Sequence, residues 1–141
     1  MPAPLRVQML IDSLTWGGAE MLLADLAAGA PDAGIEMSVA YLSAADGNVA
    51  ARRLARCGIE PEAIPVHVLL NPASVRSVRN HLARRAPDLV HTHLQYADML
   101  GVVAARSLGI RSVSTVHVMR WGGDARERAR AGVAAFVRRR W

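Results

Sequence analysis

The chain has 141 residues, of which 52% are hydrophobic and 21% are charged, and its formal net charge is +5. This composition predicts a folded domain with a sizeable core and excludes an extended, disordered chain. Residues 120–141 hold seven of the 17 arginines and two of the 12 acidic residues, so the excess positive charge lies in this end segment. Because the rest of the chain is balanced and shows no zinc-finger or RNA-binding spacing, the sequence argues against a nucleic-acid partner.

The cysteine content and the apolar runs indicate in which cell compartment the protein lies. The single cysteine, Cys57, excludes an internal disulfide and suits a reducing environment. No apolar run reaches the length of a spanning helix, and the start of the chain lacks the pattern of a secretory signal. A cytoplasmic protein is therefore expected. The absence of lysine beside abundant arginine and alanine favours a GC-rich bacterial genome.

Short apolar runs alternate with longer segments of helical periodicity. Strands are expected over residues 5–11, 35–42, 63–70, 87–93 and 110–118. Helices are expected over residues 19–30, 47–58, 72–86, 95–109 and 124–141. This alternation predicts a single-domain α/β fold, a Rossmann-like doubly wound parallel sheet with the first strand at its centre.

Sheets of this kind bind ligands beyond the carboxyl ends of their strands, near the point where the strand order reverses. Three polar motifs are expected at that edge. They are TWGGAE at residues 15–20, DLVHTHLQYAD at residues 88–98 and STVH at residues 114–117.

The glycine pair Gly17–Gly18 lies between the first strand and the first helix. Without a Cβ the backbone can approach a ligand closely, and the free amides at a helix start favour phosphate. The alternative is a plain strand-to-helix turn. The segment is neither G-x-G-x-x-G nor a Walker loop, and no acidic residue ends the second strand, so NAD binding and P-loop chemistry are disfavoured.

Three histidines follow in the other two motifs. His91 and His93 lie two residues apart in an expected strand and therefore point to the same face. His93 is nearer the carboxyl end, and His117 is expected to end the last strand and project into the cleft, where a neutral imidazole can hydrogen-bond a sugar hydroxyl. The alternative is that they are buried core histidines. A metal site is disfavoured because no carboxylate pair or known zinc spacing accompanies them.

In these motifs the sequence resembles the amino-terminal domain of the GT-B glycosyltransferases, specifically the retaining enzymes of family four. The matching pieces are GGAE, the segment from APDLVHTH to STVH, and the β-α spacing between them, which together cover residues 5–121. The resemblance implies that residues 1–121 form the acceptor-side domain, that residues 122–141 are its truncated basic end, and that the donor-binding domain is absent.

The resemblance also implies roles for individual residues. Gly17 and Gly18 would lie against the diphosphate of a nucleotide-sugar donor, whose developing charge their amides would stabilise. His117 would be catalytic, orienting a transferred hexose-type sugar, and no metal or other cofactor is expected. The residues expected to contact substrate are Glu20, His93, Gln95 and Asp98.

Partners follow from the same resemblance. They are the nucleotide-sugar donor and a sugar or lipid-linked acceptor. Because half a cleft is expected to be inactive alone, the chain is expected either to be a fragment of a longer enzyme or to work with a separate donor-domain chain. For residues 124–141 an ordinary solvated helix is favoured over a helix lying on the anionic inner face of a membrane. Two other hypotheses stay open: a noncatalytic sugar- or nucleotide-binding or regulatory module, and a sugar-nucleotide epimerase.

Overall fold

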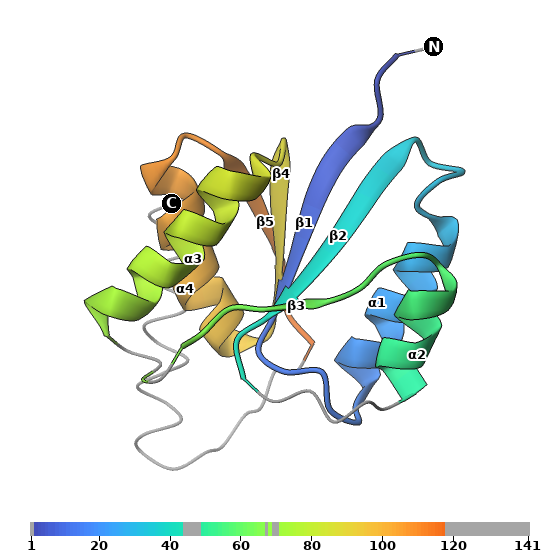
Figure 1. Cartoon of the computed structure of the whole chain (residues 1–141), viewed down its shortest axis with the longest axis horizontal. Coiled ribbons are helices and arrows are strands. Elements are labelled where there is room, and N and C mark those ends of the chain that lie inside the picture. The colour runs from blue at the N-terminus through green and yellow to red at the C-terminus, as the bar shows by residue number, and fades with distance from the viewer. Residues whose placement is uncertain (1, 44–48, 67, 69–70, 118–141) are drawn as a thin grey trace.

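A parallel sheet with its first strand in the middle organises the molecule (Figure 1). The structure, a computed structural model, describes residues 2–43, 49–66, 68 and 71–117. In this part the sheet has the order β3-β2-β1-β4-β5. The strands are β1 (Leu5–Ile11), β2 (Ile35–Tyr41), β3 (Glu62–Ala63), β4 (Leu89–His93) and β5 (Arg111–Thr115). The expected Rossmann-like, doubly wound α/β sheet is confirmed, as is the central place of its first strand.

Helices cover both faces of the sheet, with α1 and α2 on one side and α3 and α4 on the other (Figure 1). They are α1 (Gly18–Gly29), α2 (Val49–Arg56), α3 (Pro72–Arg85) and α4 (Gln95–Ser107). The start of α3 shows why these segments fold locally. The side-chain oxygen of Asn71 accepts a hydrogen bond from the Ala73 amide at 2.9 Å, and Pro72 occupies the first turn. The helix expected over residues 124–141 lies outside the described residues.

The central strand is buried on both faces along most of its length, which explains its mostly apolar sequence. Val7, Met9 and Ile11 belong to the core cluster on the α1 side, whereas Leu10 belongs to the cluster on the α3 and α4 side. Close packing on the second side requires Gly101 in α4, because a Cβ there would lie 2.7 Å from side-chain atoms of Leu10 and Thr92.

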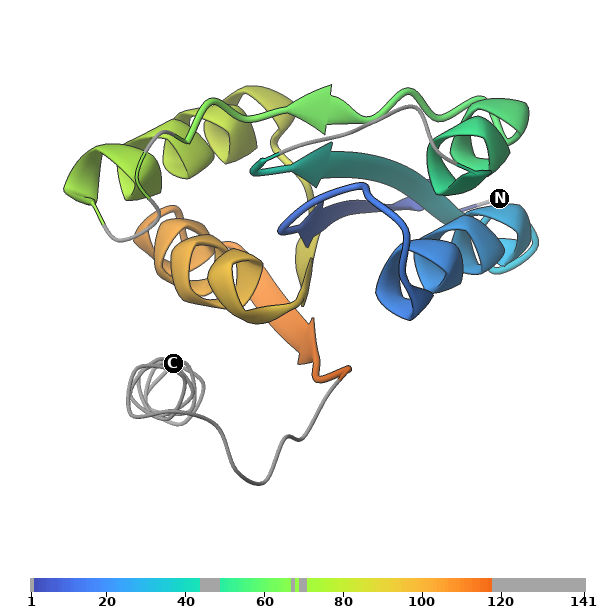
Figure 2. The same cartoon turned by 90° about the horizontal axis from the view of Figure 1, so that it is seen from below.

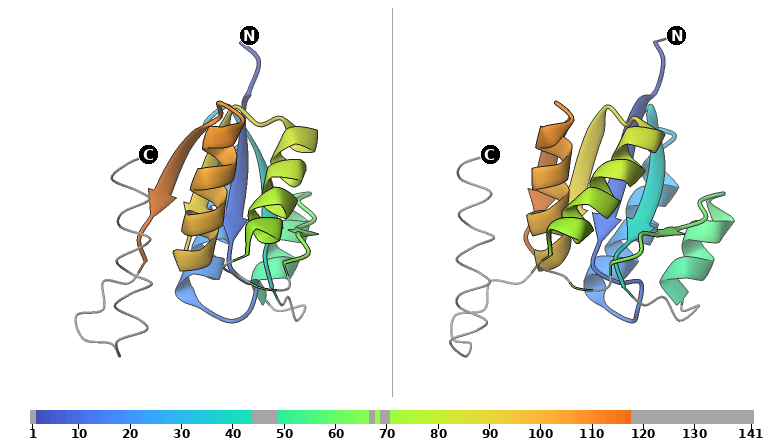
Figure 3. Two further views of the ribbon diagram at one scale, coloured as in Figure 1. Left: turned by 90° about the vertical axis from the view of Figure 1, so that its left-hand side faces the viewer. Right: turned by 60° about the vertical axis from the view of Figure 1, so that its left-hand side comes forward.

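The two edge strands, β3 and β5, are several residues shorter than the sequence pattern predicts. A strand was expected over residues 63–70, but β3 ends at Ala63. The Ile64 amide still donates to the Tyr41 carbonyl at 2.9 Å, and Pro65 then has no N–H with which to continue the ladder. At the other edge, β5 ends at Thr115 and runs in the same direction as β4 (Figure 3).

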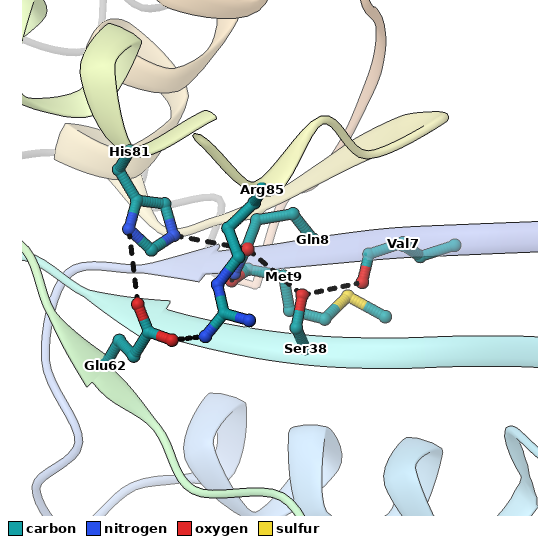
Figure 4. Close-up of polar contacts among 7 residues, drawn as sticks. All are labelled: Val7, Gln8, Met9, Ser38, Glu62, His81 and Arg85. Atoms are coloured by element: carbon teal, nitrogen blue, oxygen red, sulfur yellow. Dashed lines mark hydrogen bonds and ion pairs between the residues drawn. The ribbon is translucent and has the colours of Figure 1, made fainter. Parts of the chain in front are cut away.

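A buried polar network lies on the α3 side of β1 (Figure 4). Gln8 is only 1% exposed, and its Nε2 donates to the Met9 carbonyl at 3.0 Å. That contact leaves Gln8 Oε1 as the acceptor for Ser38 Oγ at 3.0 Å and for His81 Nε2 at 3.2 Å. The His81 hydrogen is therefore assigned to Nε2.

The carboxylate of Glu62 in β3 lies beside this network. His81 Nδ1 lies 3.6 Å from Glu62 Oε2, and Glu62 also pairs with Arg85. Burial, aided by the charge of Arg84, lowers the pKa of His81 below its ordinary value. A neutral His81 therefore links α3 to β1, while Arg85 provides the charge partner of Glu62.

Candidate functional site

The carboxyl ends of β1 and β4 form the switch point of the sheet. These strands are neighbours, but β1 is followed by β2 on one side whereas β4 is followed by β5 on the other. Open α/β sheets bind ligands at such a point. The helices α1 and α4 begin at this edge, which is the lower edge in Figure 1 and faces the viewer in Figure 2.

The glycine pair starts α1 at this edge. Gly17 precedes the helix in an extended conformation (φ −175°) and has no side-chain cap. A Cβ on Gly17 would collide with the Glu20 carboxylate, whereas a Cβ on Gly18 would meet nothing within 4 Å. A Cβ at position 17 would therefore displace the end of the Glu20 side chain, while Gly18 faces open space.

Glu20 itself is 5% exposed. Its carboxylate lies in the first turn of α1, where the positive end of the helix dipole stabilises a negative charge. The sequence predicted a phosphate beside Gly17, and the Glu20 carboxylate of the protein itself lies there. A phosphate would meet a like charge at Gly17 and open space at Gly18.

The junction between β4 and α4 is conformationally strained. Leu94 has φ +72°, which is uncommon for a leucine. Its side chain packs against the core cluster on the α1 side of the sheet. Backbone strain of this kind costs about 1–3 kcal/mol and clusters at functional sites.

Asp12, which directly follows β1, holds this junction in place. Its carboxylate accepts hydrogen bonds from the Ala97 amide at 2.6 Å and the Tyr96 amide at 3.2 Å, so it caps α4. Burial raises the pKa of Asp12 to about 6, although the helix amides favour its ionised form. Asp12 was not among the expected site residues. Its place directly after a buried strand was the available signal.

The two histidine motifs meet at the ends of β4 and β5. His93 Nδ1 lies 2.8 Å from His117 Nε2, with ring centroids 5.1 Å apart. The His91 ring lies 4.2 Å from the His93 ring, and its Nε2 is 2.7 Å from Thr115 Oγ1. His117 lies two residues beyond the end of β5, not at its last position as the sequence pattern predicted.

Burial sets the protonation of His93. Its side chain is 0% exposed. Burial first, and the nearby His91 and His117 second, lower the pKa of His93 to about 3, so the ring is neutral near pH 7. Within the described ranges, His93 Nε2 and Gln95 Nε2 are buried and have no hydrogen-bond partner.

Asp98 belongs to α4 and contacts β4 on the face opposite to His91 and His93. It is 3% exposed, and its carboxylate accepts a hydrogen bond from Thr92 Oγ1 at 2.6 Å. The Thr92 hydroxyl also lies 2.7 Å from Ser114 Oγ. Asp98 therefore anchors α4 to β4 and β5.

The residues expected to contact a ligand fall into two groups. In the described part of the chain the side chains of Glu20, His93 and Asp98 are buried, and their expected contact with a substrate stays a prediction. The expected site residues with accessible surface are Gly17, Gly18, Gln95 and His117.

Other features of the described residues concern metal binding, membrane spans and cavities. In this part of the chain no group of three His, Cys, Asp or Glu side chains is arranged to hold a metal ion. Nor is any described helix long and apolar enough to cross a membrane. A hollow of about 540 Å³ lies at the opposite edge of the sheet, where Cys57, Gly58 and Ile59 line part of it.

Comparison with known proteins gives a family match and a set of similar folds. The family model described as Glycosyltransferase Family 4 matches residues 16–141. The fold is similar to that of Anabaena HepE in complex with UDP, with a TM-score of 0.71 and 19% identity over 97% of this chain and 36% of HepE. No curated protein gives a significant sequence match.

Two further solved structures have the same fold. UDP-GlcNAc 2-epimerase from Neisseria meningitidis, bound to UDP-GlcNAc, gives a TM-score of 0.68 and 14% identity over 94% of this chain and 39% of the epimerase. MurG from Acinetobacter baumannii gives a TM-score of 0.67 and 17% identity over 96% of this chain and 39% of MurG. The chain thus spans well under half the length of the three proteins.

Proposed function

The chain belongs to Glycosyltransferase Family 4, and we propose that it forms the acceptor-side domain of a nucleotide-sugar-dependent glycosyltransferase that transfers a hexose-type sugar. One observation carries most of the proposal: the open Gly18 end of α1 and the partly exposed His117 lie at the same edge of the sheet. HepE in complex with UDP and the epimerase bound to UDP-GlcNAc support a nucleotide sugar as donor.

The proposed chemistry divides between the helix and the histidine. Amides at the start of α1 stabilise the charge that develops on the leaving diphosphate, which approaches from the Gly18 side, away from Glu20. His117 hydrogen-bonds a hydroxyl of the transferred sugar and holds it in position. In this proposal the charge on the leaving group is stabilised by backbone amides without a metal ion.

A sheet edge of this kind is one wall of a cleft. The other wall belongs, in this proposal, to a donor-binding domain in a longer protein or in a separate chain. The acceptor is a sugar or a lipid-linked sugar, and the site of action is the cytoplasm or the inner face of its membrane. Residues 1–141 by themselves are then expected to give little turnover with a panel of nucleotide sugars. Robust turnover by this chain alone would contradict the acceptor-side assignment.

An NMR titration of the chain with inorganic pyrophosphate and with UDP tests the phosphate site. We expect amide shifts around Gly18 and His117 at millimolar ligand. Gly18→Ala should leave thermal stability unchanged or slightly raised, because its methyl group meets no protein atom, and should weaken binding about fivefold by blocking close approach, a loss of about 1 kcal/mol.

Gly29→Ala is the matched control, since a Cβ there also meets nothing within 4 Å, and it should leave binding unchanged. Shifts confined to the hollow beside Cys57 and Ile59, or equal binding by the wild type and Gly18→Ala, would refute the proposed site.

A further inference from the structure

His93, at the end of β4, and His117, which follows β5, share a direct ring-to-ring hydrogen bond at the switch point. His93 Nδ1 and His117 Nε2 are 2.8 Å apart. A neutral imidazole has one N–H and one bare nitrogen, so one ring must donate and the other must accept. The proton arrangement of this pair therefore decides which hydrogen-bonding group His117 can offer to a ligand.

Two arrangements satisfy the contact. In the first, His93 Nδ1 donates and His117 carries its own hydrogen on Nδ1. In the second, His117 Nε2 donates and His93 carries its hydrogen on Nε2. The second arrangement leaves a buried N–H unpaired, because His93 Nε2 has no partner in the described part of the chain. Buried unpaired N–H groups are rarer than under-satisfied acceptors, so the first arrangement is favoured.

The two rings also differ in how firmly the fold holds them. His93 lies in β4 between Ile11 of β1 and Thr115 of β5 in the strand register, and its ring is covered completely. His117 follows the end of an edge strand and is partly exposed. The buried His93 ring can therefore orient the less constrained His117 ring.

We propose that His93 is a positioning residue that holds His117 in its Nδ1–H tautomer and fixes the orientation of its ring. His117 then presents an N–H donor to an oxygen of the bound ligand, and His93 contacts no ligand itself. A hydrogen bond on one ring nitrogen commonly sets the tautomer and the role of the other. The consequence for turnover rests on the proposed function, whereas the tautomer of His117 does not.

Long-range ¹H–¹⁵N spectra of the histidine rings test this assignment in the full chain. In the wild type at neutral pH, His117 should show the Nδ1–H pattern. His93→Asn should keep it, since the asparagine amide can reach the position of Nδ1 and donate to His117 Nε2. His93→Gln extends its amide toward the Nε2 position, so it loses the contact and His117 should become a mixture of tautomers.

His81→Gln is the matched control, because His81 is equally buried but belongs to the separate Gln8 network. It should leave the His117 spectrum unchanged. An Nε2–H tautomer of His117 in the wild type, or the same His117 spectrum in His93→Asn and His93→Gln, would overturn the proposal.

Turnover provides a separate readout in an assembly with donor-domain activity. There His93→Gln should lower kcat about tenfold with little change in KM for the donor, and His93→Asn should lower it less. A changed tautomer with unchanged kcat would overturn the role of His117 in the proposed function while leaving the positioning by His93 intact.

Discussion

Acid should weaken this fold in part through His93. Burial lowers the folded-state pKa of His93 to about 3, whereas an unfolded imidazole titrates near 6.5. Below about pH 6.5 the unfolded chain therefore binds a proton that the folded chain does not. The stability associated with neutral His93 is present above that pH and is lost as the pH falls.

The size of the loss follows from linkage. At pH 5 the folded ring is still neutral and the unfolded ring is almost fully protonated, which costs about 2 kcal/mol relative to pH 8. Burial also lowers the pKa values of His81 and His91, so they act in the same direction. Asp12 acts in the opposite direction. Burial raises its pKa to about 6, and protonation of its carboxylate returns about 1.5 kcal/mol between pH 8 and pH 5.

Urea unfolding at pH 8 and pH 5 separates these contributions when three proteins are compared. His93→Asn, which cannot titrate, should lose about 2 kcal/mol less than the wild type on acidification. Asp12→Asn should lose about 1.5 kcal/mol more, because the compensating carboxylate is gone. Two substitutions at one edge of the sheet thus move the pH dependence in opposite directions. Identical pH dependence in the wild type and His93→Asn would refute the reasoning.

Three further predictions concern packing and charge. Gly101→Ala should lower the free energy of unfolding by about 1 kcal/mol, because collision with Leu10 and Thr92 outweighs the gain in helix propensity. In thermal melts the control Gly29→Ala should instead be neutral or stabilising, and a stabilised Gly101→Ala would contradict the close packing of α4. Thr92→Val removes a hydrogen bond to the buried Asp98 carboxylate and should cost about 1–3 kcal/mol in urea unfolding; a loss below about 0.5 kcal/mol would argue against this anchor. Glu20→Gln removes a like charge from the start of α1 and should tighten pyrophosphate binding about fivefold in the NMR titration, corresponding to about 1 kcal/mol. Weaker binding would show that the Glu20 carboxylate supports the ligand instead of opposing it.

The sequence by itself determined the order of the elements and the edge at which polar residues gather. The apolar run of residues 5–11 predicted a strand buried on both faces, and glycines and prolines marked the breaks between segments. These signals are local, since they depend on side-chain periodicity and on residues that stop a helix or a ladder. The expected shared face of His91 and His93 also follows from the two-residue period of a strand, and the structure confirms it.

Only the tertiary structure decided which polar groups pair with which. Asp12 caps a helix 84 residues further along the chain, and His93 meets a histidine 24 residues away. The Glu20 carboxylate lies against Gly17, and the Asp98 carboxylate accepts a hydrogen bond from Thr92, so both side chains have neighbours within the fold. No local pattern encodes these pairings, because they depend on strand register and on where each helix crosses the sheet. Burial then selects the contacts, since a polar group that loses water must find its partner within the fold.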